Sequence, residues 1–226
     1  MCVVPNTNTF NLALYLMTNI FQDAVFSVDC WTKEKPISSS SDRSVRIWKV
    51  AEETHLVFRG HKSSIDNVQW LTDSTFVSAG QDGHLHYWKD SQKSSFSHVS
   101  AAHGFDESNN PRWISGLANI KMSNIVATGS NDGKTYLYFN TLHYLYVLCE
   151  YSSIQSVGFV RIWTAHTEEK QIKQCLAIPV SGCVNAIGIT QQLLVAGCGK
   201  EHKYGRWWNI KGNQNKLSIV RWKCSQ

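Results

Sequence analysis

The chain has 226 residues, and 42% of them are hydrophobic, which is enough to bury a substantial core in one large domain or two small ones. Its formal net charge of +5 is mildly basic, so the charge permits a nucleic-acid partner but does not argue for one by itself. The seven cysteines are odd in number and include no Cys-x-x-Cys pair, which argues against a disulfide framework or a zinc site and favours reduced, intracellular thiols.

Residues 1–21 are predicted to be an N-terminal leader outside the repeats that follow. Residues 10–21 are as apolar as the core of a signal peptide, but no Lys or Arg precedes them. The stretch is also shorter than the roughly 20 apolar residues that a membrane-spanning helix needs. We therefore predict neither secretion nor a membrane partner.

Three similar units follow, each with small residues on a strand, a tight turn that carries Asp, and an alternating strand that ends in aromatic residues. They are SSSSDRSVRIW at 38–48, VSAGQDGHLHYW at 77–88 and VATGSNDGKTYLYF at 126–139. The turn residues Asp42, Asp82 and Asp132 lie 40 and 50 residues apart. The first spacing matches the roughly 40 to 45 residues of a four-stranded propeller blade, so the sequence predicts an all-β, WD-repeat β-propeller.

The second unit also opens with Arg-Gly-His at 59–61. In WD-repeat proteins, which this pattern resembles, the His, a strand Ser or Thr, the turn Asp and a closing Trp form one hydrogen-bonded set. Because buried polar groups need partners, such a set would fix the turn and the strand register together. The residues expected to be structural in this way are His61, Ser78, Asp82 and Trp88, with Asp42, Trp48 and Asp132 in the neighbouring units.

Two sharper interpretations lack support in the sequence. A catalytic pair of Asp82 and His61 would need a nucleophile, but no Ser or Cys stands in an elbow such as Gly-x-Ser-x-Gly. His84 and His86 lie two apart on a predicted strand and face one side, but no third metal ligand is in view. We therefore predict no enzyme, no metal site and no cofactor.

A fourth unit follows Trp163 and the Ala-His pair at 165–166. The stretch GCVNAIGITQQLLVAGCG at 182–199 predicts two apolar, alternating strands. The segment GCGKEHKYGRWWNIK at 197–211 is predicted to be a long loop, because it has no Asp-Gly turn and carries a double Trp.

Four stretches give the chain a more specific resemblance. They are QDAVFSVDC and SDRSVRIWKVAEETHLVFRGHKSSID within 22–66, SAGQDGHLHYW at 78–88, AHG, RWISGLA and NIVATGS within 102–130, and VAGCGKEHKYGRWWNIK at 195–211. With them the sequence resembles the WD-repeat protein family of the U3 small nucleolar ribonucleoprotein. The resemblance implies a scaffold that binds U3 small nucleolar RNA and the core proteins of that particle during 18S pre-rRNA processing, in the nucleolus, with no small-molecule substrate.

The last of these stretches places basic groups beside aromatic ones. That combination suits RNA, because phosphates attract cations and unstacked bases stack on flat side chains. The candidates for RNA or partner contact are Lys200, His202, Lys203, Arg206, Trp207 and Lys211, together with Arg112 and Trp113 after the polar loop HGFDESNNP. The alternative is that one Trp closes the blade and the charges form a solvated rim.

Two features depart from the family. In the third unit Trp163 follows Asp132 by 31 positions instead of about six, so we predict an insertion at 134–159 and hypothesise translated intron sequence or a recent insertion. The family propeller has seven blades and needs roughly 300 residues, whereas residues 22–226 supply about four to five blades. We therefore expect a truncated propeller whose missing blades lie N-terminal.

Two other functions stay open at this point. One is a WD-repeat adaptor with a protein-only role, such as a ubiquitin-ligase substrate receptor, and the other is a degenerate, non-functional copy. Replacing Arg206, Lys203 and Trp207 separates RNA binding from the adaptor role, because recovery of U3 RNA should fall only in the first case.

Overall fold

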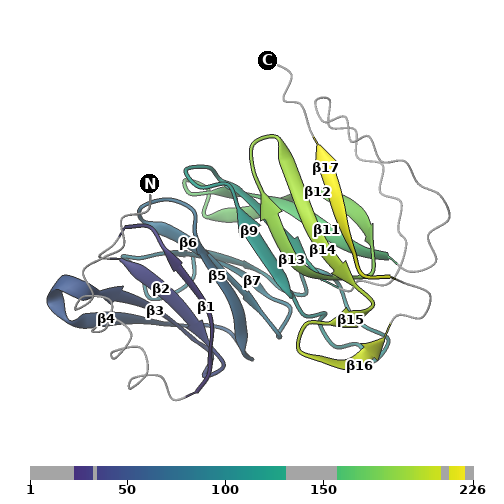
Figure 1. Cartoon of the computed structure of the whole chain (residues 1–226). Helices are drawn as coiled ribbons and strands as arrows, with labels where there is room; N and C mark the ends of the chain where they lie inside the picture. The colour runs from purple at the N-terminus through teal and green to yellow at the C-terminus, as the bar shows by residue number, and fades with distance from the viewer. Residues whose placement is uncertain (1–22, 33–34, 131–156, 210–213, 222–226) are drawn as a thin grey trace, which may run out of the picture.

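The computed structural model describes residues 23–32, 35–130, 157–209 and 214–221. Within them the chain forms four antiparallel sheets that stand side by side (Figure 1), and one additional two-stranded hairpin. Small antiparallel sheets arranged radially are the blades of a β-propeller. The predicted all-β architecture is confirmed. The predicted leader at 1–21, Asp132, most of the predicted insertion at 134–159 and Lys211 lie outside the described residues.

The first two sheets each pair their strands in the order of the sequence. The first sheet contains β1 (Val25–Cys30), β2 (Pro36–Ser40), β3 (Ser44–Lys49) and β4 (Thr54–Arg59), with a short 3-10 turn η1 (Val50–Glu52) before β4. The second sheet contains β5 (Ile65–Trp70), β6 (Thr75–Gly80), β7 (Leu85–Lys89) and β8 (Ser97–Val99).

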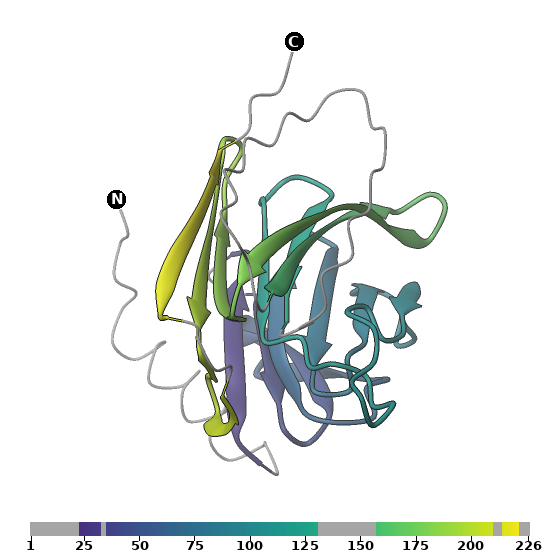
Figure 2. The same cartoon turned by 90° about the vertical axis from the view of Figure 1, so that its right-hand side faces the viewer.

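The third and fourth sheets are less regular. The third contains β9 (Gly116–Asn119), β10 (Ile125–Gly129), β11 (Val157–His166) and β12 (Gln171–Ser181), and its long β11–β12 hairpin extends beyond the other strands in Figure 2. The fourth contains β13 (Cys183–Ile189), β14 (Leu193–Gly199) and β17 (Lys216–Arg221). The strands β1, β5, β9 and β13 contact one another in succession, so they are the inner strands of the four sheets.

Local sequence chemistry explains the tight turns of the first two sheets. Between β2 and β3 the carboxylate of Asp42 accepts a 2.9 Å hydrogen bond from the backbone N–H of Ser44. Between β6 and β7 Gly83 has a φ of +67°, and a Cβ atom there would lie 2.7 Å from Cβ of Pro111. Only glycine satisfies both the left-handed backbone and the close approach of the next loop.

The hydrophobic core lies between the sheets, in three layers. Ile37, Ile47 and Phe58 of the first sheet pack against Trp70 and Trp88 of the second. A second cluster joins the second and third sheets, and a third cluster joins the third and fourth sheets. The second and third sheets therefore bury alternate residues against one neighbour and the remaining residues against the other, as strand periodicity requires, whereas the first and fourth sheets each pack against one neighbour among the described residues.

The segment 197–211 is not the long loop that we expected. The alternating pattern of β14 continues to Gly199, and the next residues form a hairpin of β15 (Glu201–His202) and β16 (Gly205–Asn209). The third strand of the fourth sheet is β17, whose residues pair with β14 from Leu193↔Arg221 to Cys198↔Lys216. The hairpin with its double Trp is thus inserted between two strands of the fourth sheet and does not supply the closing strand itself.

Candidate nucleic-acid interface

The polar set of the second sheet forms one hydrogen-bonded chain. Nδ1 of His61 lies 3.0 Å from the carboxylate of Asp82, and Nε2 of His61 lies 2.8 Å from Oγ of Ser78. Nε1 of Trp88 donates a 2.8 Å hydrogen bond to the same Oγ. Burial alone would raise the pKa of Asp82, but hydrogen bonds from His61 and from the backbone N–H groups of Lys62 and His84 lower it to about 2. These contacts hold the turn, the strand and the preceding loop together.

The first and third sheets repeat parts of this arrangement. In the first sheet Trp48 donates a 2.7 Å hydrogen bond to Ser38, and Asp42 pairs with Arg46 at 3.1 Å. In the third sheet Trp163 donates a 2.7 Å hydrogen bond to Thr128, whose hydroxyl also lies 2.9 Å from Nε2 of His103. His103 and Thr128 were not among the predicted structural residues, although both lie in stretches that carried the resemblance.

The β15–β16 hairpin is held against the inner strands. Its first strand is fixed to β13 because the side-chain amide of Asn185 donates a 2.8 Å hydrogen bond to the carbonyl of Glu201 and accepts a 3.0 Å bond from the N–H of Lys203. In Figure 1 the hairpin lies at the lower ends of the sheets. Its position follows from a side chain that offers both a donor and an acceptor.

Lys203 reaches from the hairpin to the second and third sheets. The residue is exposed as a whole, but its ammonium donates a 2.6 Å hydrogen bond to the carbonyl of Ser115, just before β9. Burial lowers the pKa of Lys203, and the negative charge of Asp66 opposes that shift. Asp66, on β5, is only 1% exposed, and its burial raises the pKa of its carboxyl to about 6, against the attraction of Lys203.

Aromatic contacts complete the attachment of the hairpin. The ring of His202, which is 4% exposed, meets the ring of Trp113 edge to face with 5.1 Å between centroids. The ring of Tyr204 lies 5.5 Å from that of Phe26 on β1, and Lys203 lies 4.8 Å above the Tyr204 ring. Burial lowers the pKa of His202 to about 4, with a smaller effect of the same sign from Lys203. Burial, and then the charge of Asp66, raise the pKa of Tyr204.

The structure therefore separates the predicted contact residues into groups. His202, Lys203 and Trp113 lie together and attach the hairpin to the fold, which joins two segments that the sequence presented as separate candidates. Lys200 is exposed, and its backbone N–H donates a 3.2 Å bond to the side chain of Asn215. Arg112 donates a 3.1 Å bond from Nε to the carbonyl of Phe105. The backbone of Arg206 and Trp207 lies in β16, and Lys211 lies outside the described residues.

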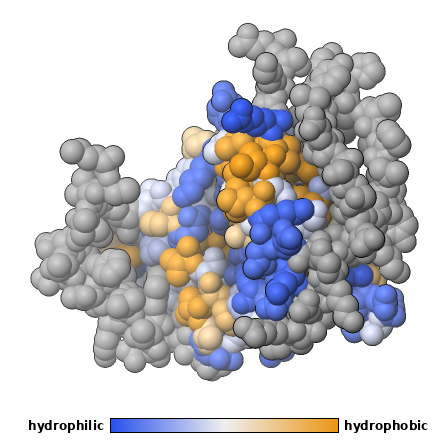
Figure 3. All heavy atoms as spheres, turned by 45° about the vertical axis from the view of Figure 1, so that its right-hand side comes forward, coloured by the Kyte–Doolittle hydropathy of each residue, from blue (hydrophilic) through white to orange (hydrophobic). Residues whose placement is uncertain are grey.

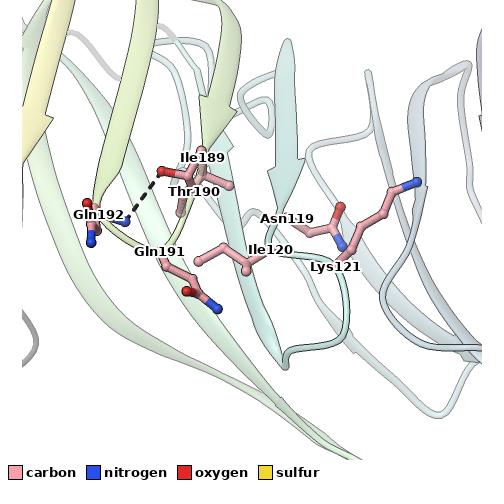
Figure 4. Close-up of a pocket in the computed structure, with 7 residues that line it drawn as sticks. All are labelled: Asn119, Ile120, Lys121, Ile189, Thr190, Gln191 and Gln192. Carbon is pink, nitrogen blue, oxygen red and sulfur yellow. Dashed lines mark hydrogen bonds between the residues drawn. The ribbon is translucent and has the colours of Figure 1, made fainter. Parts of the chain in front are cut away.

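An open groove lies between two loops of the third and fourth sheets (Figure 4). It has a volume of about 510 Å³ and is lined by Asn119, Ile120, Lys121, Ile189, Thr190, Gln191 and Gln192. Its cation is already engaged, because the ammonium of Lys121 donates hydrogen bonds to the carboxylate of Asp29 at 3.2 Å and to the carbonyl of Cys30 at 3.1 Å. The groove therefore presents mainly uncharged amide and hydroxyl groups, and it is poorly suited to bind a phosphate.

Two further observations concern the described part of the chain. It contains no group of three or more His, Cys, Asp or Glu side chains placed to hold a metal ion. None of its helical segments is long and apolar enough to cross a lipid bilayer.

Comparison with known proteins places the fold. Residues 52–89, which run from η1 to the end of β7, match the family model described as "WD domain, G-beta repeat". The chain is a WD-repeat protein. The matched segment contains the whole of the hydrogen-bonded set of His61, Ser78, Asp82 and Trp88.

This WD-repeat chain is also similar to proteins associated with U3 RNA. It is 31% identical over 174 residues to U3 small nucleolar RNA-interacting protein 2 of Mus musculus. The aligned stretch covers 75% of this chain and 31% of the mouse protein. The solved structures of the RRP9 WD40 repeats and of U3-55K match with TM-scores of 0.74 and 0.73, at 31% and 30% identity, and each match covers 89% of this chain and 56% of that chain. The predicted resemblance and the partial propeller are confirmed.

The WD-repeat chain spans about a third of the length of the mouse protein and of its human counterpart.

The functional residues that sequence reasoning missed are Asp66, Ser115, Asn185 and Tyr204, which hold the hairpin. Tyr204 stood within the selective string, but no local pattern marks Asp66, because its partner is more than a hundred residues away in the sequence.

Proposed function

We propose that this WD-repeat protein is a non-catalytic scaffold subunit of the U3 small nucleolar ribonucleoprotein, which binds U3 RNA and proteins of the particle during ribosome biogenesis in the nucleolus. The names of its relatives support the assignment to this particle, since they are called U3 small nucleolar RNA-interacting and U3 snoRNP-associated proteins. The propeller fold supports a scaffold, because its sheets present loops and edges to partners around one rigid core.

The observation that carries the proposal is the attachment of the β15–β16 hairpin. Lys203 and His202 hold it to the segment just before β9, and Tyr204 holds it to β1 of the first sheet, so the hairpin backbone is positioned before any partner binds. Lys200 at its base remains exposed, and Arg206 and Trp207 lie on its second strand. A positioned hairpin with basic and aromatic residues loses little conformational entropy when it binds a flexible single strand.

The experiment is recovery of U3 RNA with the tagged chain from nucleolar extract. We expect the double substitution Lys200→Glu and Arg206→Glu to reduce U3 RNA recovery at least about tenfold, because two phosphate contacts would become repulsive. Lys93→Glu is the control. It makes the same charge reversal as Lys200→Glu at an exposed residue in the loop after β7, outside the hairpin, and it should leave U3 RNA recovery unchanged. The wild-type melting temperature of the double variant would show that the fold is intact.

The same experiment separates the protein-only alternative. If the double variant recovers U3 RNA as well as the wild type does, direct RNA binding by the hairpin is wrong. If, in addition, no U3 RNA but other proteins accompany the wild-type chain, an adaptor role replaces the proposed one.

A further inference from the structure

The inner strands carry one irregular position that can be compared between sheets. In β1, β5 and β13 the pairing with the next strand skips one residue, so each of these strands contains a β-bulge. In β9 the equivalent position lies two residues before the pair Leu117↔Thr128, which corresponds to Val68↔Ser78 in the second sheet. A bulge turns its side chain out of the regular alternation of a strand. We call the residues at these positions the bulge set: Phe26, Asp66, Ser115 and Asn185.

Three members of the bulge set surround Lys203, in the turn of the β15–β16 hairpin. The side-chain oxygen of Asn185 accepts a 3.0 Å hydrogen bond from the backbone N–H of Lys203. The carbonyl of Ser115 accepts a 2.6 Å bond from its ammonium. Burial lowers the pKa of Lys203, and the nearby carboxylate of Asp66 opposes that shift. The turn is therefore fixed through both the backbone and the side chain of one residue.

The fourth member, Phe26, meets the other residue of the turn. Its ring lies 5.5 Å from the ring of Tyr204. The hairpin leaves β14 at Gly199, where a Cβ atom would lie 2.9 Å from Nδ2 of Asn185, so the close approach continues along the hairpin. A turn of two residues that interacts with equivalent positions of four sheets must lie across the ends of the inner strands, and Figure 1 shows the hairpin at that end of the sheets.

Asp66 makes it costly to move Lys203 out of this place. Asp66 is 1% exposed, and its Oδ2 atom has no hydrogen-bond partner in the described part of the chain. A buried carboxylate needs a compensating charge, and Lys203 supplies the nearby cation. If Lys203 turned outward to a phosphate, Asp66 would stay buried without that charge. Lys203 is thus better suited to hold the hairpin than to contact RNA.

Other cations face outward beside the hairpin. Lys200, just before β15, and Lys216, at the start of β17, are both exposed, and so is Asn215. Figure 3 shows a hydrophilic area beside a hydrophobic one on the side of the molecule that carries the fourth sheet. Cations that RNA can reach are therefore separate from the cation that the bulge set holds.

We propose that Phe26, Asp66 and Asn185 are positioning residues for RNA binding. They fix the turn at 203–204, and through it the hairpin, without touching RNA themselves. The inference rests on the proposed binding of U3 RNA by the hairpin, and it gives Lys203 an internal role in place of a phosphate contact. A chain whose hairpin is released binds RNA only in the fraction of molecules that have the hairpin in place, so the apparent dissociation constant rises by the inverse of that fraction.

The test is the affinity of the purified full chain for a U3 RNA transcript, measured by filter binding, together with hydrogen exchange of the amides in β15 and β16. Phe26→Ala removes the contact with Tyr204, so it should raise the dissociation constant about tenfold and speed exchange in the hairpin. Val28→Ala, on the same strand, is the matched control. Val28 is 55% exposed, and its replacement should change neither quantity.

The salt dependence of binding separates positioning from contact. Each phosphate contact to a single strand adds about 0.7 to the slope of log affinity against log salt concentration. Lys200→Met should lower the affinity and reduce that slope by about 0.7. Lys203→Met and Asp66→Asn should each lower the affinity about fivefold and leave the slope unchanged. Their combination should lose no more affinity than the stronger single variant, because both substitutions release the same turn.

Failure of this inference can be told apart from failure of the proposed function. A wild-type chain that does not bind the transcript overturns both. If the wild-type chain binds and Phe26→Ala binds equally well, or if Lys203→Met reduces the salt slope as Lys200→Met does, only the positioning role is wrong. Phe26 is 39% exposed, so Phe26→Ala should fold and decide the matter even if Asp66→Asn does not fold.

Discussion

Nε1 of Trp163 donates a 2.7 Å hydrogen bond to Oγ1 of Thr128, although the two residues are 35 positions apart in the sequence. The same bond joins Trp88 to Ser78 and Trp48 to Ser38 across only 10 positions. The difference of 25 positions lies in the connection between β10 and β11, while the strands keep the register of the other sheets. The third sheet therefore closes as its neighbours do, with extra residues in its turn.

We expect a chain that lacks residues 134–158 to fold with the third sheet intact except for the first two residues of β11, Val157 and Gly158, which the deletion removes. Joining Gly133 to Phe159 restores the 10-residue spacing, and it shortens a connection that costs loop-closure entropy, so the free energy of unfolding should stay equal or rise by up to about 1 kcal/mol. The measurement is urea denaturation followed by tryptophan fluorescence.

The matched deletion of 134–159 removes one residue more. It takes away Phe159, which is 6% exposed, and leaves the turn one residue short, so this chain should be less stable by about 2 kcal/mol or more. Failure of the 134–158 deletion to fold, under conditions in which the intact chain folds, would contradict the predicted insertion.

Asp82→Ala should lower the free energy of unfolding by about 2–4 kcal/mol. The substitution leaves the ring of His61 and the backbone N–H groups of Lys62 and His84 without their acceptor in a buried place. Asp73→Ala is the control, because Asp73 is exposed, and its effect should stay within about 0.5 kcal/mol. Equal effects of the two substitutions in chemical denaturation would show that the set does not stabilise the sheet.

Acid should destabilise the second sheet through His86. Its side chain is 4% exposed, neither ring nitrogen has a partner among the described residues, and it stacks against Trp88 and His98. Burial lowers the pKa of His86 from 6.5 to about 3, so the unfolded chain binds a proton in this interval that the folded chain does not. The free energy of unfolding should therefore fall as the pH falls below about 6.5, by about 2 kcal/mol at pH 5.

His86→Phe removes this dependence and keeps a ring in the stack. Because burial raises the pKa of Asp66 to about 6, Asp66 changes stability in the opposite sense between about pH 4 and 6. The informative quantity is therefore the difference in the free energy of unfolding between the variant and the wild type, measured at pH 7 and again at pH 5. We expect that difference to shift in favour of the variant at pH 5.

Lys203→Met should release the hairpin, whereas Lys200→Met should not. The first substitution removes the hydrogen bond to Ser115 and leaves Asp66 without its facing cation, so the free energy of unfolding should fall by about 1–2 kcal/mol. The second changes an exposed side chain. Hydrogen exchange of the amides in β15 and β16 provides the measurement: faster exchange should occur only in Lys203→Met.

Sequence reasoning recovered the parts of this fold that local patterns determine. The Asp-Gly turn at Asp82 and the set around His61 lie within the second sheet, and the alternating strands at 182–199 lie within the fourth, so each follows from turn chemistry and strand periodicity inside a single sheet. The hairpin was mistaken for a loop because its pairing is short and interrupted by a register shift, and because its anchors belong to other sheets. Lys203 was predicted to contact RNA or a partner, with a solvated rim as the alternative, and only the tertiary structure brings it to Ser115.

The contact between Tyr204 and Phe26 also has a consequence for how the chain folds during synthesis. Phe26 lies on the first strand, and its partner belongs to the hairpin between the last two strands. The ribosome therefore releases β1 long before the residue that covers its end exists, and at roughly 5–20 residues per second the delay lasts on the order of ten seconds. A chaperone that shields β1 during this interval would improve the yield of native protein without altering its equilibrium stability.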